Sequence, residues 1–313
     1  MTTQYDDLSR GNWRVLNKME QPRSHTPVAE VGGKLFLLGG GGMQFASLNT
    51  NIAFDPRNGT WETRKPMPTA RSGTISCVVN NKIYVIGGGF KQPNGQFKFL
   101  DAVEIYDPST DTWTTGPSML ATHDYPGGLL ADNHIYIFAG HHPDATKAGP
   151  RTDPGFAFCE RLNLTTGHWE ELAPIPTPRF ALSAVELGGK LLAMGGVAFR
   201  PEGFNNFDHI EEYRPSSNTW HLVPDLKLPW TAAGQANCVI GETLFTFGGY
   251  SGDGIHSRAA CLDPTSKTWK RLPDMPAPRA AVGLGVLGRT VYLFGGWADD
   301  GRSPTETVFA YDF

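Results

Sequence analysis

The chain has 313 residues, of which 40% are hydrophobic and 19% charged, and this composition excludes global disorder. Its 37 glycines and 24 prolines are spread from end to end, which excludes helical bundles and coiled coils because both residues interrupt long helices. Lys and Arg number 27 against 31 Asp and Glu, a net charge of −4 without any basic run, so the charge pattern argues against nucleic acid as a partner.

The first residues, MTTQYDDLSRGN, are polar and acidic, and no run of about 18 apolar residues follows anywhere. We therefore expect no secretory signal, no membrane contact and a cytoplasmic location. The four cysteines lie far apart in short apolar runs, without the spacing of metal ligands: Cys77, Cys159, Cys238 and Cys261. We expect them to be reduced and to act as small buried hydrophobic side chains.

Three markers recur along the chain and divide it into six units. The first is a tryptophan, whose copies are 48 to 56 residues apart: Trp13, Trp61, Trp113, Trp169, Trp220 and Trp269. The second is an apolar run ending in glycine, at Gly40, Gly88, Gly140, Gly196, Gly249 and Gly296. The third is a turn such as DPRNGTW before each later tryptophan. The units are predicted at 22–67, 70–119, 122–174, 178–225, 230–275 and 278–313.

Each unit is predicted to contain four short strands. In the second unit they are the runs SGTISCVV, KIYVIGG, AVEIYD and TWTTGP, with the turn NN joining the first two as a hairpin. Four antiparallel strands at this period predict an all-β fold, a six-bladed β-propeller with one unit per blade.

The two ends of the chain are predicted to complete one blade. The last unit stops at FAYDF, after its third strand, whereas residues 12–17 form a fourth strand with no unit before it. We therefore predict a single domain over 1–313, whose ring is closed by the N-terminal strand in the last blade, because closure removes exposed sheet edges.

The chain from Trp13 to Phe313 resembles the kelch family of six-bladed β-propellers. The residues that carry the resemblance are the diglycines, the spaced tryptophans and the aromatic residues of IAFDP, EIYDP and FAYDF, with the arginines that precede the first strands: Arg23, Arg71, Arg179 and Arg279. These four lead-in arginines recur so regularly that we interpret them as structural residues, holding adjacent blades by hydrogen bonds. The resemblance implies, from the substrate adaptors of the family, that the propeller recognises a peptide segment or small ligand.

Function on such a scaffold is expected in its loops. The loops between second and third strands vary most, and lie near 41–50, 89–101, 141–155, 197–207, 250–257 and 297–305. They are rich in aromatic residues, namely Phe45, Phe90, Phe97, Phe99, Phe199, Phe204, Phe207 and Tyr250. We therefore place the binding face on this side and predict an aromatic-lined cup there.

The third unit departs from its siblings at two places that should meet on one rim. THDY stands where the others have Pro-Arg or Ala-Arg, and AGHHPD stands where the others have the diglycine. We interpret His123, Asp124 and His141 as candidate catalytic residues, because imidazole titrates near neutrality and a carboxylate can orient it.

The candidate binding residues share a position at the predicted cup. They are His25, Phe90, Tyr125, His142, Phe199, Trp230, Tyr250, Trp297 and Asp299. Of these, His25 and Tyr125 occupy matching offsets at the mouth of the central channel, as does Ala181, and Trp230 replaces the lead-in arginine of the fifth unit. We expect no metal and no cofactor, because neighbouring residues such as His141 and His142 point to opposite faces of an extended chain.

Three functions fit this sequence. The first, which we favour, is a ligand-recognition propeller that binds a small molecule or a peptide segment in the cup. The second is a cofactor-free isomerase, epimerase or cyclase, in which the His/Asp cluster of the third blade moves protons; sialic-acid epimerases resemble this fold. The third is a protein-interaction scaffold that uses the outer surfaces and needs no pocket.

Overall fold

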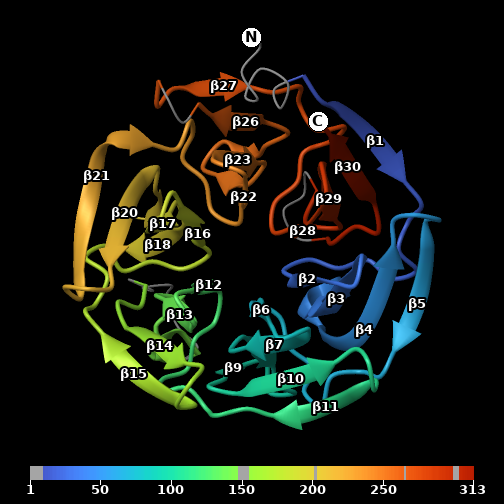
Figure 1. Ribbon diagram of the computed structural model, residues 1–313, viewed down its shortest axis with the longest axis horizontal. Helices are drawn as coiled ribbons and strands as arrows, with labels where there is room; N and C mark the ends of the chain where they lie inside the picture. The colour runs from blue at the N-terminus through green and yellow to red at the C-terminus, as the bar shows by residue number, and fades with distance from the viewer. Residues whose placement is uncertain (1–9, 147–154, 201–202, 264–265, 299–302) are drawn as a thin grey trace.

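Six four-stranded antiparallel sheets surround a central axis (Figure 1). This computed structural model describes residues 10–146, 155–200, 203–263, 266–298 and 303–313. In each sheet the first strand lies next to the axis and the fourth on the outside, and the six first strands contact one another in sequence round the ring. The six-bladed all-β propeller predicted from the repeats is confirmed. No helix in the described ranges is long and apolar enough to cross a membrane.

The strands of each blade follow one another from the axis outward. Blade 1 has β2 (Val28–Val31), β3 (Lys34–Gly41), β4 (Ser47–Asp55) and β5 (Thr60–Arg64). Blade 2 has β6 (Ile75–Val79), β7 (Lys82–Ile86), β10 (Val103–Asp107) and β11 (Thr112–Thr115). Blade 3 has β12 (Gly127–Ala131), β13 (His134–Phe138), β14 (Cys159–Asn163) and β15 (His168–Leu172).

The second half of the ring repeats this order. Blade 4 has β16 (Ser183–Leu187), β17 (Lys190–Met194), β20 (His209–Arg214) and β21 (Thr219–Lys227). Blade 5 has β22 (Ala236–Ile240), β23 (Thr243–Phe247), β26 (Ala259–Leu262) and β27 (Trp269–Arg271). Blade 6 has β28 (Gly283–Leu287), β29 (Thr290–Phe294), β30 (Val308–Asp312) and β1 (Asn12–Leu16).

The loops between second and third strands carry short elements of their own. These are the hairpins β8 (Gly89–Lys91) with β9 (Phe97–Phe99), β18 (Val197–Arg200) with β19 (Gly203–Asn206), and β24 (Tyr250–Ser251) with β25 (Gly254–Ile255). Two 3₁₀ turns, η1 (Met43–Phe45) and η2 (Pro143–Thr146), occupy the loops of blades 1 and 3.

The ring is closed by the first strand of the chain, as the sequence predicts. β1 pairs with β30, so that Trp13 lies opposite Tyr311 and Arg14 opposite Ala310 (Figure 1). The indole of Trp13 packs on the ring of Tyr311, with 4.9 Å between centroids, and an Arg14 Nη2–H donates to Asp312 Oδ1 at 2.9 Å. The last blade therefore combines the two ends of the described chain.

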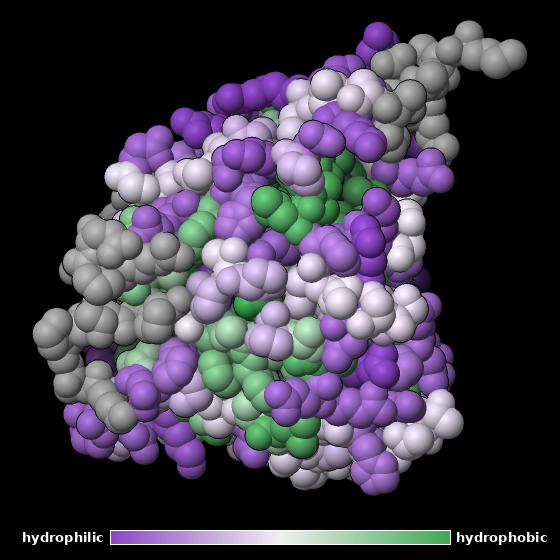
Figure 2. All heavy atoms as spheres, turned by 90° about the vertical axis from the view of Figure 1, so that its left-hand side faces the viewer, coloured by the Kyte–Doolittle hydropathy of each residue, from purple (hydrophilic) through white to green (hydrophobic). Residues whose placement is uncertain are grey.

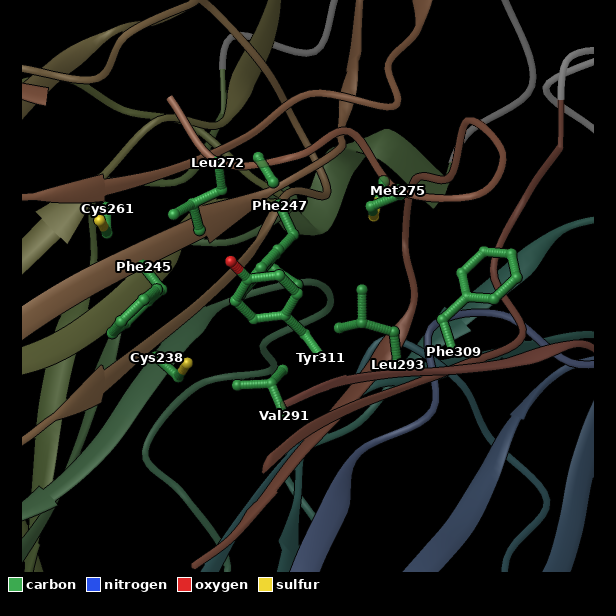
Figure 3. Close-up of a cluster of buried hydrophobic side chains, with 12 residues drawn as sticks. Cys238, Phe245, Phe247, Cys261, Leu272, Met275, Val291, Leu293, Phe309 and Tyr311 are labelled. Atoms are coloured by element: carbon green, nitrogen blue, oxygen red, sulfur yellow. The ribbon is translucent and has the colours of Figure 1, made fainter. Parts of the chain in front are cut away.

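The hydrophobic core lies between blades rather than inside them. One cluster joins Phe245 and Phe247 of blade 5 to Val291, Leu293 and Tyr311 of blade 6 (Figure 3). It also takes in two of the cysteines, Cys238 and Cys261, and all four cysteines are buried. Because each sheet buries its faces against its neighbours, no blade has a complete core of its own.

The diglycines bring each blade close to the next. The second residue of each pair, which in blade 3 is Ala139-Gly140, donates its N–H to the carbonyl at the lead-in position of the following blade, at 2.7 to 3.0 Å: Gly40 to Arg71, Gly88 to His123, Gly140 to Arg179, Gly196 to Ala232, Gly249 to Arg279 and Gly296 to Arg23. The first glycine leaves room for that backbone: a Cβ at Gly248, whose φ is +60°, would lie 2.2 Å from the Arg279 carbonyl oxygen. Gly248 is therefore required by both its φ and the close approach, whereas blade 3 carries Ala139 at the equivalent position with a φ of +62°.

The lead-in arginines join blades through their main chains and brace their own blades through their side chains. The Arg71 guanidinium is fully buried and donates to Glu104 at 3.0 Å and to the Val85 carbonyl at 3.1 Å, all within blade 2. The Arg179 guanidinium likewise pairs with Glu211. The expected link between adjacent blades is thus made by the backbone, whereas the guanidinium links the second and third strands of one blade.

A second set of inter-blade bonds lies at the periphery. Five tryptophans donate their indole N–H to a carbonyl of the preceding blade at 2.6 to 2.9 Å: Trp13 to Pro273, Trp113 to Lys65, Trp169 to Pro117, Trp220 to Ala173 and Trp269 to Lys227. The exception is Trp61, whose Nε1 is buried without a hydrogen-bond partner in the described ranges. Trp61 faces the junction of blades 6 and 1, where the ring closes.

Deleting residues 1–17 should destabilise the protein severely. The deletion removes the outer strand of blade 6 and the Trp13 ring, and losing a packed tryptophan alone costs about 3–5 kcal/mol. We expect the melting temperature in a thermal unfolding experiment to fall by about 10 °C or more. A chain that begins at Arg10 keeps β1 and is the control; equal stability of the two truncated chains would contradict closure by β1.

The indole hydrogen bonds between blades give a second test of how the ring closes. Trp113→Phe should lower the free energy of unfolding by about 1 kcal/mol, because it removes a made hydrogen bond. Trp61→Phe should be neutral or stabilising, because the indole N–H that it removes has no partner among the described residues. Urea unfolding of the two variants measures the difference in stability. An equal loss of unfolding free energy in both would contradict the finding that the Trp61 indole N–H has no partner among the described residues.

Candidate functional site

The loop-rich face brings together the ends of two strands in every blade. Five blades form a backbone bridge there, between Ser24 and Gly41, Ser72 and Gly89, Phe180 and Val197, Ala233 and Tyr250, and Ala280 and Trp297. In blade 3 the equivalent residues are Asp124 and His141, and the His141 N–H donates to the Asp124 carbonyl at 2.8 Å. The segments THDY and AGHHPD therefore meet at one rim position.

Asp124 and His141 also pair through their side chains. The distance from His141 Nδ1 to Asp124 Oδ2 is 2.8 Å, and the Asp124 residue is only 3% exposed. The imidazole lies between the rings of Phe99, at 5.5 Å, and Phe180, at 3.8 Å between centroids. A carboxylate that orients an imidazole in a largely apolar setting is a chemically competent acid–base pair.

His123, the third candidate of this cluster, is fully buried. Its Nδ1 lies 2.6 Å from the Ala139 carbonyl oxygen and its Nε2 lies 3.0 Å from Glu160 Oε1. Both ring nitrogens thus face acceptor oxygens, one of a carbonyl and one of a carboxylate. His123 takes the place that Arg71 and Arg179 hold in their blades. Its ring is out of reach of a ligand, and its bonds fix the backbone that leads into Asp124.

The mouth of the central channel is formed by one residue from each blade. These six residues, which we call the axial mouth, all have left-handed φ values of 49° to 66°: His25, Gly73, Tyr125, Ala181, Gly234 and Ala281. Five of the junctions between them carry an N–H to carbonyl bond of 2.7 to 3.0 Å, for example from His25 to Ala281 and from Ala181 to Tyr125. They surround a cavity of about 160 Å³.

A continuous chain of rings crosses this face. We call it the aromatic belt, and its members in order are Phe45, Trp297, His25, Tyr125, His141, Phe180, Phe199, Phe204 and Tyr250. Successive ring centroids are 3.8 to 6.4 Å apart, and the rings come from blades 1, 3, 4, 5 and 6. Aromatic pairs in such offset and edge-to-face geometries stabilise one another and leave π-faces for a ligand.

The two titratable residues of the axial mouth are both held uncharged. Burial lowers the pKa of His25, and the nearby His141 lowers it further. Burial, followed by the charge of Asp124, raises the pKa of Tyr125 above its usual range. At neutral pH this region therefore presents a neutral imidazole and a neutral phenol.

The structure places the remaining candidate residues at different points. Phe90 is half-buried in β8, and His142 packs its ring on the edge of Phe156 at 5.6 Å. In blade 5 Ala232 occupies the lead-in arginine position, and Trp230, two residues earlier, donates its indole N–H to the Gly248 carbonyl at 3.0 Å. The candidate Asp299 lies outside the described residues.

One belt residue is not among those that the sequence pattern singles out. Phe180 follows Arg179 directly, at the rim position that Asp124 holds in blade 3, and its ring contacts both His141 and Phe199. Aligning the six units on their lead-in residues shows the signal, since this position carries Ser24, Ser72, Ala233 and Ala280 in other units.

Two other kinds of site lack the required geometry. Within the described ranges, no three His, Cys, Asp or Glu side chains converge so as to hold a metal ion. In blade 5, Ser251 Oγ lies 2.7 Å from His256 Nε2, but Asp253 contacts the same hydroxyl and the same nitrogen. A catalytic triad needs the carboxylate on the other ring nitrogen, so this group has the geometry of a hairpin brace.

Comparison with known proteins agrees with the repeat. Kelch-like protein terF of Aspergillus terreus is 27% identical over 218 residues, which is 66% of this chain and 47% of that protein. Kelch-like protein 36 of Mus musculus is 29% identical over 291 residues, 90% of this chain and 45% of that protein. The chain thus spans about half the length of these relatives.

A solved structure entitled "Structure of YjhT" shares the fold. Its TM-score is 0.77 at 16% identity, covering 94% of this chain and 96% of that one. The family model of the Attractin/LZTR1 beta-propeller matches residues 1–257. The chain, with its six kelch-type blades, therefore belongs to the Attractin/LZTR1 β-propeller family.

Proposed function

We propose that the protein is a recognition propeller that binds a small molecule or a peptide segment on the aromatic belt. The observation that carries this proposal is the continuity of the belt, which runs across five blades and includes His25 and Tyr125 of the 160 Å³ cavity of the axial mouth. Ligand sites are typically concave and aromatic, with few polar groups. Kelch-propeller relatives point in the same direction, towards a protein-interaction or ligand-binding propeller.

The polar part of the belt supports recognition that is specific in orientation. Here the buried carboxylate of Asp124 and the imidazole of His141 lie among the belt rings. A ligand that stacks on the rings would gain apolar contact area from them, and the polar pair would fix its orientation.

Acid–base catalysis is the second candidate, and the Asp124 Oδ2 to His141 Nδ1 contact of 2.8 Å favours it. In that case His141 would exchange a proton with a bound substrate, and Asp124 would hold the ring and compensate its positive charge. Tyr125, whose phenol stays protonated, lies edge-on to His141 at 5.3 Å and would be the second proton donor.

Removing belt rings should abolish ligand capture without unfolding the protein. We expect Trp297→Ala and Tyr250→Ala to weaken binding about 10-fold or more, because each deletes a half-buried ring at a binding surface. The measurement is a thermal-shift and ligand-observed NMR screen of a small-molecule and peptide library, followed by titration of each binder against the variants.

The matched control is Leu222→Ala, which removes an exposed side chain from β21 on the outer flank. Figure 2 shows a flank of the ring, where hydrophilic residues surround smaller hydrophobic patches. Binders whose affinity falls in Leu222→Ala and not in the belt variants would contradict the proposal and support a scaffold that uses the outer surface.

The catalytic candidate has a separate test. Each binder is incubated with the protein in D₂O, and NMR follows the uptake of deuterium from solvent into carbon-bound positions of the binder. If the pair is catalytic, His141→Gln and Asp124→Asn should slow uptake by about 10²–10⁴. His168→Gln, which alters an exposed histidine on β15 of the same blade, should leave uptake unchanged. The absence of uptake into every binder would exclude the exchange of carbon-bound protons at this site.

A further inference from the structure

The axial mouth is filled on one side and open on the other. On the side of blades 1 to 3, the His25 and Tyr125 rings meet with 4.6 Å between centroids, and Tyr125 lies over Gly73, where a Cβ would be 3.2 Å from its ring. On the side of blades 4 to 6, the same positions carry Ala181, Gly234 and Ala281. The six backbones match, so the difference comes from side chains alone.

The lining of this cavity carries no ionised side chain. Within the described part of the chain, its polar side chains are those of His25, Thr26, Thr74, Tyr125 and Gln235, and the rest of the lining is apolar or glycine. The pKa of His25 is lowered and that of Tyr125 is raised, both chiefly by burial, so both side chains favour their uncharged forms. The adjacent carboxylate of Asp124 is already paired with His141.

Two neutral polar groups in this lining lack partners among the described residues. The Thr74 hydroxyl and both atoms of the Gln235 amide are buried without a hydrogen bond. Buried polar groups are normally bonded, so a neutral group that entered the mouth could satisfy these atoms once the Thr74 or Gln235 side chain turned toward it. An ion would meet no opposite charge in this lining, and burying an unpaired charge is far more costly than burying a bonded amide.

We propose that the open half of the axial mouth, beside Ala181, Gly234 and Ala281, binds one uncharged group that has an apolar body and an amide or hydroxyl. This inference rests on the proposed recognition function and names the chemical class that the site accepts. The group can belong to a small molecule or to a side chain of a peptide. In both cases the cavity would select for an uncharged group with an apolar body and an amide or hydroxyl.

The residues at the equivalent positions of blades 1 and 3 suggest substitutions that would fill the site. Ala181 and Ala281 already carry a Cβ at a left-handed φ, and His25 and Tyr125 show that rings are accommodated at the equivalent positions. Ala281→Tyr and Ala181→Tyr should therefore fill the open half with little backbone strain. Leu222→Tyr, on the exposed surface of β21, adds the same ring outside the mouth and is the control.

The test uses three probes of one shape and different charge on the full-length protein: benzamide, benzamidine and benzoate. We expect benzamide to bind in ligand-observed NMR titrations at pH 7, and its cationic and anionic counterparts to bind at least about 10-fold more weakly. Ala281→Tyr and Ala181→Tyr should each weaken benzamide about 10-fold or more, whereas Leu222→Tyr should leave it unchanged. Melting temperatures establish which variants are folded, and one folded filling variant is sufficient.

The outcomes separate this inference from the function on which it rests. Equal or tighter binding of either ion, normal benzamide binding by a folded filling variant, or no benzamide binding at all overturns the inference. Ligands that respond to Trp297→Ala but not to Ala281→Tyr would leave the recognition function standing without it. N-acetyltyrosinamide is the peptide-like arm: tighter binding than benzamide supports a peptide side chain as the source, and weaker binding supports a small molecule.

Discussion

The whole molecule depends on one constraint, which is that no blade can bury both faces of its sheet alone. The core clusters lie between neighbouring blades, as where Phe247 of blade 5 and Tyr311 of blade 6 pack in one group. An open row of blades would leave two such faces in water, so the chain must bend into a circle and its ends must meet. Pairing of β1 with β30 is the consequence, and it joins segments that are farthest apart in the sequence.

Closure also requires polar groups to be matched at every junction. At the inner end the diglycine N–H groups donate to the lead-in carbonyls of the next blade, and at the outer end the tryptophan indoles donate to the preceding blade. All six inner junctions carry their bond, whereas Trp61 at the closing junction has no partner in the described ranges. At the closing junction, therefore, the apolar faces are packed as at the other junctions, but the indole hydrogen bond found at the other five is missing among the described residues.

A repeated scaffold lets single blades change without loss of the fold. Blade 3 has His123 in place of the arginine. The His123 ring pairs with Glu160, so the contact between the lead-in side chain and the third strand is kept, while the next residue is Asp124. Blade 5 loses the arginine and fills its place with the indole of Trp230. These departures accumulate on the loop-rich face, where the belt and the uncharged axial mouth lie. The candidate site is therefore built from the positions that the ring does not need for its closure.

The sequence by itself determined the number of blades, their four strands and the closing strand. It could do so because the alternation of strands, the tight turns and the glycine positions are local properties, and six copies of one pattern leave a single way to bury them. It also predicted that Asp124 and His141 would meet, since they end neighbouring strands of one blade.

Only the tertiary structure decided which side chains face the cup. It buried His123 between Glu160 and the Ala139 carbonyl, turned Trp230 towards Gly248, and added Phe180 to the belt. It also left half of the axial mouth open, through three small residues of blades 4, 5 and 6. The physical reason is that the exposure and direction of a side chain depend on the neighbouring blade packed against it, and that neighbour is about fifty residues away in the chain.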